Sequence, residues 1–207
     1  MFTIRRDYQK EIVIEKSRFI CTLKKVASEE EAQEFIKAMK KEYWDATHNC
    51  SAYLVDALAQ RSSDDGEPSG TAGIPMLEVL KKNDLVGTAC VVTRYFGGIK
   101  LGAGGLVRAY SSSVAGALKE CGLAERVLMT NYSFMYDTAR VGRVLNVLYQ
   151  QNLFEILDVE YGLKAKIILR MKDEEKEQAE SWLTENLFEE IVLEKEGSEY
   201  AEVPVEI

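Results

Sequence analysis

The hydrophobic positions in the first half of the chain follow a strand period in some segments and a helix period in others. Four short apolar runs have the length and composition of strands: Ile12–Ile14, Arg18–Leu23, Asn49–Val55 and Leu85–Thr93. Ser28 and Glu31 have the spacing of a capping box, which predicts a helix after Ser28. The apolar residues of that helix recur at helical intervals: Phe35, Ile36 and Met39.

Two further helices and one loop complete the predicted first half. Pro75 suits the first turn of a helix that runs through Leu80. Leu106–Cys121 is compatible with a second helix, and Gly122 is a good helix stop. The segment Gln60–Gly73 is rich in serine, glycine and proline, so we expect a loop there.

The second half predicts a different order of elements. The expected elements are a strand at Glu125–Tyr136, a helix through Val141, Val144, Leu145 and Leu148, a hairpin of Phe154–Val159 and Leu163–Leu169, a charged helix at Asp173–Asn186 and a strand at Ile191–Glu199. The order β-α-β-β-α-β points to a ferredoxin-like domain. We therefore expect an α+β protein of two domains, residues 1–123 and 124–207.

Composition narrows the class of protein. The 207 residues are 46% hydrophobic and 29% charged, which is typical of a folded globular protein. No apolar run approaches the roughly 20 residues of a membrane span, and the N-terminus lacks the apolar region of a signal peptide. The four cysteines are far apart and form no CxxC pair, which favours reduced thiols and a cytoplasmic location.

The net charge of −8 is unevenly distributed. Residues 1–122 carry 17 lysines and arginines against 16 acidic residues, whereas residues 123–207 carry 9 against 18. An anion-binding face is therefore expected only in the first half.

The stretch Thr93–Tyr110 combines five glycines with three cations and contains no acidic residue. A strand, a glycine-rich turn and a helix N-terminus form a place where backbone N–H groups meet an anion such as phosphate. The structural alternative is a tight strand-to-helix crossover with solvated cations, because the spacing is neither GxxxxGK[ST] nor GxGxxG. The candidate anion-binding or nucleic-acid-binding residues are Arg94, Tyr95, Gly97, Gly98, Lys100, Gly102, Gly104, Gly105 and Arg108.

A second candidate site is the loop after Ser63, which contains the carboxylates of Asp64, Asp65 and Glu67. These carboxylates could hold a divalent cation or act as a general base. The EF-hand spacing is absent, however, so an acidic turn exposed to solvent is the favoured interpretation. The only histidine lies upstream at the start of a strand, where an orienting hydrogen bond is favoured over catalysis. The residues of this possible second site are His48, Asp64, Asp65, Glu67, Ser69 and Thr71. No catalytic residue, metal or cofactor is predicted.

Three blocks of sequence together resemble the bacterial branch of the IMPACT/YigZ family. They are HNCSAYLV at His48–Val55, DDGEPSGTAG at Asp64–Gly73 and TRYFGGIKLGAGGLVRAY at Thr93–Tyr110. The resemblance covers essentially the whole chain. It implies an N-terminal domain with the ribosomal protein S5 domain 2-like fold and a ferredoxin-like C-terminal domain similar to the last domain of elongation factor G. For bacterial members it also implies association with nucleic acid or the ribosome.

The leading functional hypothesis is a non-enzymatic regulator of translation that binds RNA or the ribosome through the basic glycine-rich turn. The first alternative is a small-molecule kinase, or another enzyme with a phosphate-bearing ligand, which uses the same turn with the carboxylates of Asp64–Glu67. The second is a protein-interaction module that recruits a protein partner. No membrane partner is expected.

Overall fold

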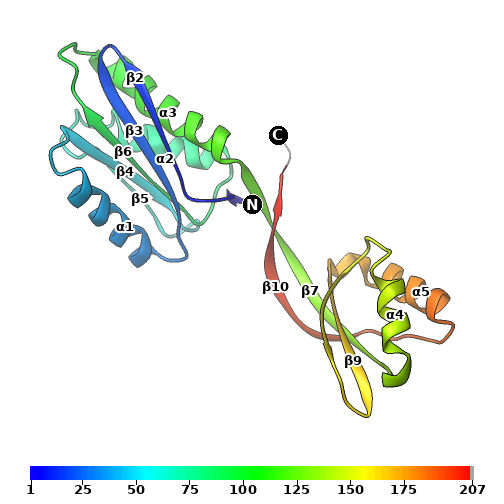
Figure 1. Cartoon of the computed structure of the whole chain (residues 1–207). Coiled ribbons are helices and arrows are strands. Elements are labelled where there is room, and N and C mark those ends of the chain that lie inside the picture. Colours follow the sequence, from blue (N-terminus) through cyan, green and yellow to red (C-terminus); the bar gives the residue numbers. More distant parts are fainter. Residues whose placement is uncertain (206–207) are drawn as a thin grey trace. The chain divides into compact units, whose positions relative to one another are not determined.

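The structure is a computed structural model that describes residues 1–205 of the chain (Figure 1). These residues form two compact units. The first comprises Met1–Arg126 together with residues 203–205, and the second comprises Val127–Glu202. The prediction of an α+β protein with two domains is confirmed.

The first unit is built on a five-stranded antiparallel sheet with the order β2-β3-β6-β4-β5. Its elements are β1 (Phe2–Ile4), β2 (Tyr8–Ile14), β3 (Ser17–Lys25), α1 (Glu29–Glu42), β4 (His48–Leu54), β5 (Gln60–Ser63), α2 (Gly73–Lys82), β6 (Thr88–Tyr95) and α3 (Gly102–Cys121). The short strand β1 lies outside this sheet and pairs with the start of β7 (Leu123–Asp137).

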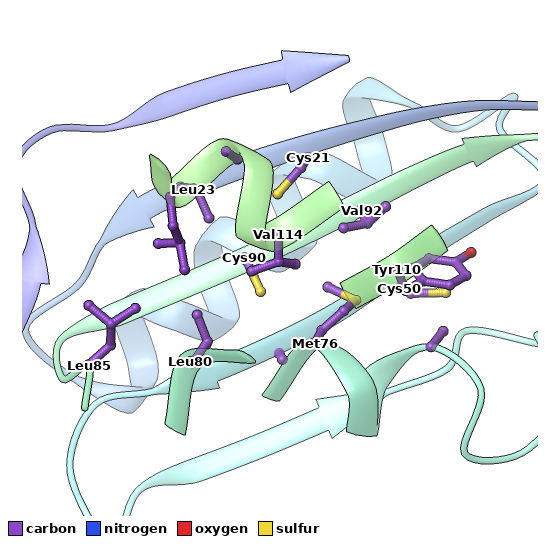
Figure 2. Close-up of a cluster of buried hydrophobic side chains, with 14 of the residues drawn as sticks. Cys21, Leu23, Cys50, Met76, Leu80, Leu85, Cys90, Val92, Tyr110 and Val114 are labelled. Atoms are coloured by element: carbon purple, nitrogen blue, oxygen red, sulfur yellow. The ribbon is translucent and has the colours of Figure 1, made fainter. Parts of the chain in front are cut away.

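Helices cover both faces of this sheet (Figure 1). Successive side chains of a strand point to opposite faces, so Cys90 and Val92 of β6 join the core beneath α2 and α3. Ala89 and Val91 join the core beneath α1. Figure 2 shows Cys90 and Val92 among the side chains of the larger core. Burial on both faces agrees with the apolar segment Ala89–Val92 in the middle of β6.

The sheet register brings three side chains of different chemistry together at one end of the larger core. Arg94 of β6 is directly opposite Phe19 of β3 and His48 of β4. Arg94 follows Cys90 and Val92 by steps of two, and these residues belong to the core beneath α2 and α3. The strand pattern therefore directs the arginine inward.

Three predicted boundaries are corrected by the structure. Gln60–Ser63, expected within a loop, forms the edge strand β5 and pairs with β4. Its polar sequence shows no strand period because it lies at the sheet edge, where backbone pairing alone defines the strand. β6 begins at Thr88, later than the expected Leu85. α3 begins at Gly102, four residues before the expected Leu106, in a segment where glycines hide the helical signal.

The second unit has the predicted ferredoxin-like order of elements. They are β7, η1 (Thr138–Arg140) with α4 (Val141–Leu148), β8 (Glu155–Glu160), β9 (Lys164–Met171), η2 (Asp173–Glu175) with α5 (Lys176–Leu187), and β10 (Glu194–Pro204). The strand order β10-β7-β9-β8 corresponds to 4-1-3-2 of a β-α-β-β-α-β chain. β10 begins at Glu194, after the expected Ile191. Ile191 and Leu193 precede the strand and are buried in the core of this unit.

A close approach between α2 and β5 gives a test of this packing. A Cβ atom at Gly73 would lie 2.7 Å from the backbone N of Ser63. Gly73→Ala is therefore expected to lower the free energy of unfolding of the first unit by about 1–3 kcal/mol. Gly104→Ala is the control, since its Cβ would meet only Arg108 Nη1 at 3.7 Å, and alanine favours a helix. Urea denaturation that finds both variants equally stable would contradict this packing.

Candidate functional site

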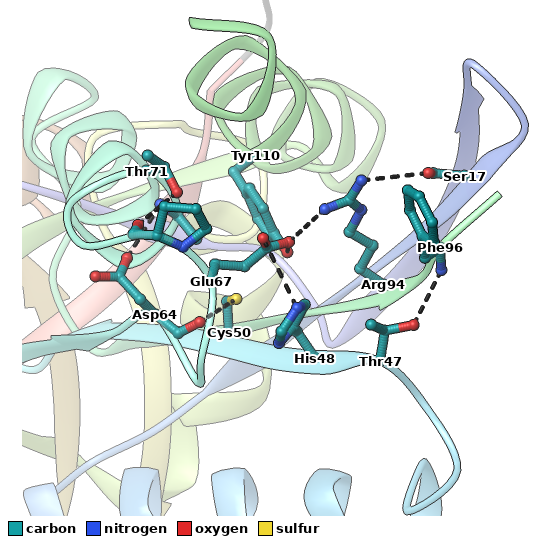
Figure 3. A network of polar contacts seen from close by, with 12 residues as sticks. Ser17, Thr47, His48, Cys50, Asp64, Glu67, Thr71, Arg94, Phe96 and Tyr110 are labelled. Atoms are coloured by element: carbon teal, nitrogen blue, oxygen red, sulfur yellow. Dashed lines mark hydrogen bonds and ion pairs between the residues drawn. The ribbon is translucent and has the colours of Figure 1, made fainter. Parts of the chain in front are cut away.

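A buried ion pair joins the two loops that the sequence analysis singled out. Arg94 Nη1 donates to Glu67 Oε1 at 2.7 Å, and the two side chains are 5% and 3% exposed. Arg94 lies at the end of β6, and Glu67 lies in the loop between β5 and α2 (Figure 3). A charge removed from water at this depth requires a partner, so the pair constrains both loops.

Arg94 makes further contacts that hold its guanidinium in one orientation. Its Nη2 donates to Ser17 Oγ at 3.4 Å, at the start of β3. Its Cζ lies 5.3 Å from the ring centre of Phe19 and 5.5 Å from that of Phe96, which is half exposed. Within residues 1–205, Arg94 Nε has no hydrogen-bond partner.

Glu67 also accepts a hydrogen bond from α3. Tyr110 Oη donates to Glu67 Oε1 at 2.8 Å. Burial raises the pKa of Tyr110, and the neighbouring Cys50 and Glu67 raise it further, so this phenol stays protonated and donates. Figure 3 shows Glu67 between Arg94 and Tyr110. The carboxylate thus connects the loop with a strand and a helix.

The histidine and the nearby cysteine have structural hydrogen bonds. His48 Nδ1 lies 2.8 Å from the carbonyl oxygen of Asp65; a carbonyl only accepts, so Nδ1 carries the proton. His48 Nε2 lies 3.8 Å from Glu67 Oε2. Burial raises the pKa of Cys50 to about 12, and its thiol donates to the carbonyl of Asp64 at 2.9 Å. Cys50 is therefore an inert thiol, not a nucleophile.

The second candidate loop is held in place by its own carboxylates. Asp64 accepts hydrogen bonds from the backbone N–H groups of Gly70, Ala72 and Gly73 at 2.8–3.1 Å. Burial works to raise the pKa of Asp64, but these three donors outweigh it and the pKa is lowered. The carboxylate therefore satisfies the otherwise free amides at the start of α2.

The remaining residues of this loop are also engaged locally. Asp65 accepts from Lys40 Nζ at 2.5 Å and from the backbone N–H of Asn49 at 2.6 Å. Thr71 Oγ1 donates to the carbonyl of Pro68 at 2.6 Å, while Ser69 is exposed. Among the described residues, no group of three or more His, Cys, Asp or Glu side chains could hold a metal ion.

The glycine-rich turn after β6 leads into an open helix end. Gly102 is the first residue of α3 and has a φ of 71°. The N-cap residue Leu101 makes no side-chain hydrogen bond, and the first turn contains no acidic residue. The exposed residues Gly102 and Gly104 leave the first-turn backbone accessible. Such a helix end presents N–H groups and a positive dipole to solvent.

Two exposed cations flank this helix end. Lys100 lies two residues before Gly102, and Arg108 Nη1 would lie 3.7 Å from a Cβ at Gly104. The guanidinium thus lies beside the first turn of α3. Neither Lys100 nor Arg108 makes an ion pair within the part of the chain that the structure describes.

The base of the turn is fixed against a neighbouring hairpin. A Cβ atom at Gly97 would collide with the backbone of Lys16 and Ser17, so only glycine fits there. The N–H of Gly97 donates to Ser17 Oγ at 3.1 Å, and the N–H of Phe96 donates to Thr47 Oγ1 at 3.0 Å. These contacts leave the outer part of the turn, which includes Gly98 and Lys100, exposed.

The structure divides the nine candidate residues of the turn into three groups. Arg94 is buried in the ion pair with Glu67, and half-buried Tyr95 donates to Asp45 at 2.9 Å. Five residues lie at the exposed turn and helix end: Gly98, Lys100, Gly102, Gly104 and Arg108. Gly97 is half-buried at the base, and Gly105 is half-buried beside Leu101.

Sequence reasoning missed three residues that hold the ion pair and the turn in place. Ser17, Thr47 and Tyr110 each contact a residue far from them in the sequence. The one available signal was Arg94 itself. An arginine placed by the strand period on a buried face requires an acidic partner.

Comparison with known proteins places the chain in a family. The model of the Impact N-terminal domain matches residues 15–118, and a domain of unknown function (DUF1949) matches residues 139–187. The IMPACT family member YvyE of Bacillus subtilis (strain 168) is 49% identical over 186 residues, which cover 89% of this chain and 85% of that protein. These matches describe a two-domain α+β protein, and the chain belongs to the IMPACT family.

Two other proteins are similar to the chain, one in sequence and one in structure. The IMPACT family member YigZ of Escherichia coli (strain K12) is 36% identical over 152 residues, covering 66% of this chain and 74% of that protein. A solved structure described as the crystal structure of a hypothetical protein is 29% identical, with a TM-score of 0.59. The match covers 93% of this chain and 95% of that one.

Family membership supports a translation-related regulator as the kind of protein, and IMPACT family proteins are generally interaction modules. Within residues 1–205, no helix is both long enough and apolar enough to cross a membrane.

Removal of the charge on Glu67 is expected to destabilise the first unit strongly. Glu67→Gln leaves the Arg94 cation buried without a counter-charge, so the free energy of unfolding of the first unit should fall by about 3 kcal/mol. Glu11→Gln is the matched control, because Glu11 pairs with Arg18 at 2.8 Å on the surface, and the loss there should stay below about 1 kcal/mol.

The measurement is urea denaturation followed through NMR signals of the first unit, which separates its unfolding from that of the second. Equal losses in the two variants would contradict the importance of the buried pair.

Proposed function

We propose that the chain is a translation-associated regulatory protein that binds RNA, as free RNA or in the ribosome, through the exposed turn after β6 and the N-terminus of α3. The observation that carries the proposal is the open end of α3, with no capping side chain, flanked by Lys100 and Arg108. Free backbone amides and cations together suit the phosphate groups of a nucleic acid backbone.

The surroundings of the turn support this use. Phe96 is 47% exposed and lies beside the guanidinium of Arg94, so its ring is available for stacking on an unpaired base. The buried pair of Arg94 and Glu67 holds the strand end from which the turn begins. The site therefore has a rigid base and an exposed cationic rim, which favours contacts to phosphate over sequence-specific recognition.

The kinase alternative receives little support from the carboxylates on which it depends. Asp64 caps α2, and Glu67 accepts from Arg94 and Tyr110. Ser113 Oγ donates to the carbonyl of Ala109 within α3 instead of facing the turn. RNA phosphate is therefore the preferred ligand class.

Reversal of the charges beside the turn is expected to weaken RNA binding, whereas the same reversal elsewhere on the first unit is not. Lys100→Glu with Arg108→Glu should weaken binding to a single-stranded RNA oligonucleotide and to purified ribosomes by at least about tenfold. It should also reduce the slope of log affinity against log salt by about one unit or more. Fluorescence anisotropy at several salt concentrations measures both quantities for the oligonucleotide, and cosedimentation measures ribosome binding.

Lys81→Glu with Lys82→Glu is the matched control, since it changes the net charge equally but lies in the last turn of α2. The control should bind as the parent does. Salt-insensitive binding, or equal binding by the turn variant and the parent, would contradict the proposal. Binding to ribosomes that persists in the turn variant would instead indicate the protein-interaction alternative.

A further inference from the structure

The face of the sheet that α1 covers contains a cavity outside the network of Arg94 and Glu67. α1 packs over the middle of the sheet, against β4 and β6. Toward the edge strand β5 the helix leaves a cavity of about 370 Å³, lined by residues of α1, β4 and β5. This volume falls within the range of roughly 300–1,000 Å³ of small-molecule sites.

The two walls of the cavity follow from the periods of their elements. Gln33, Lys37 and Lys40 recur at intervals of four and three, so they lie along one side of α1. On the sheet, Tyr53 is opposite Arg61 and Ser51 is opposite Ser63. Both cross-strand pairs line the cavity. The helix thus contributes a cationic wall, and the strands contribute hydroxyl groups and an arginine.

The charge of this lining is opposite to that of the chain as a whole. The lining residues include three cations, Lys37, Lys40 and Arg61, and no aspartate or glutamate, although the chain carries a net charge of −8. Lys40 is paired with Asp65. Lys37 and Arg61 make no ion pair with any residue that the structure describes. Two positive charges on opposite walls therefore face the cavity without a protein counter-charge.

We propose that this cavity binds the phosphate group of a small phosphate monoester. Arg61 and Lys37 supply charged donors from opposite walls, which suits a dianion better than a single carboxylate. The hydroxyl groups of Ser51 and Ser63 add neutral donors beside them.

The cavity also accommodates the organic part of such a ligand. Ile36 and Tyr53 provide apolar surface at the lining. The site is separate from the proposed RNA site, because it lies on the α1 face, whereas the network beneath the turn belongs to the face of α2 and α3. Each site can therefore be altered without changing the residues of the other.

NMR titration of the ¹⁵N-labelled full chain tests the proposal with defined probes. Inorganic phosphate and adenosine monophosphate are each expected to cause saturable shifts of the backbone amides around Lys37 and Ser62–Ser63. Adenosine, which lacks the phosphate, should cause none. Lys37→Ala with Arg61→Ala should weaken the affinity by at least about tenfold, and Lys100→Ala with Arg108→Ala should leave it unchanged.

Several results would overturn the proposal. They are the absence of saturable shifts at the cavity, shifts confined to Gly102–Gly105, or equal affinity of the cavity variant and the parent. Shifts at the cavity with an RNA oligonucleotide but not with phosphate or adenosine monophosphate would assign the cavity to the nucleic acid chain instead. The side chains of Lys37 and Arg61 are exposed, so the variant that lacks both should fold as the parent does. Its amide spectrum without ligand verifies this.

Discussion

The buried ion pair between Glu67 and Arg94 is the constraint on which the candidate site depends. It joins residues 27 positions apart in the sequence and ties a loop to the end of the central strand β6. Because breaking such a pair leaves an uncompensated charge in the interior, both loops must keep their positions for as long as the unit is folded. Tyr110 extends the same constraint to α3 through its bond to Glu67.

This constraint explains how an exposed glycine-rich turn can have a defined geometry. The turn begins directly after Arg94 and Tyr95, and its base is fixed by the contacts of Gly97 with Lys16 and Ser17. Only the outer residues and the start of α3 remain accessible to a ligand. The base of the turn is rigid, and the N–H groups at the start of α3 are free to donate. This arrangement suits a phosphate-binding surface, because the protein loses little conformational entropy when the ligand binds.

Much of the fold was predictable because its strongest signals are local. The helix start at Ser28, the apolar segment Ala89–Val92 of β6 and the β-α-β-β-α-β order of the second unit appear in the structure. Ser28 accepts from the N–H of Glu31, whereas the carboxylate of Glu31 accepts from the N–H of Ala27 and not from that of Ser28, as a full capping box requires. The strand β5 was not predictable, because its polar residues lie at a sheet edge and owe their conformation to pairing with β4. Local patterns carry no information on such a partner.

The candidate site was predictable only in part. The sequence pointed to the two loops and their residue types, and the structure shows that the loops meet. It could not indicate that Arg94 and Glu67 bind each other, because pairing across 27 residues depends on sheet register. Nor could it indicate Ser17 and Tyr110, whose roles arise from contacts between separate elements. The cavity beside α1 likewise depends on how the helix crosses the sheet.

Hydrogen exchange at single backbone amides tests the central role of the ion pair most directly. In Glu67→Gln, exchange should accelerate at the amides of Phe96 and Gly97 and in the loop Asp64–Ala72, where the network holds the backbone. The amides of α5, in the second unit, should exchange as in the parent. Unchanged exchange at Phe96, Gly97 and the loop would contradict the claim that this pair holds the site together.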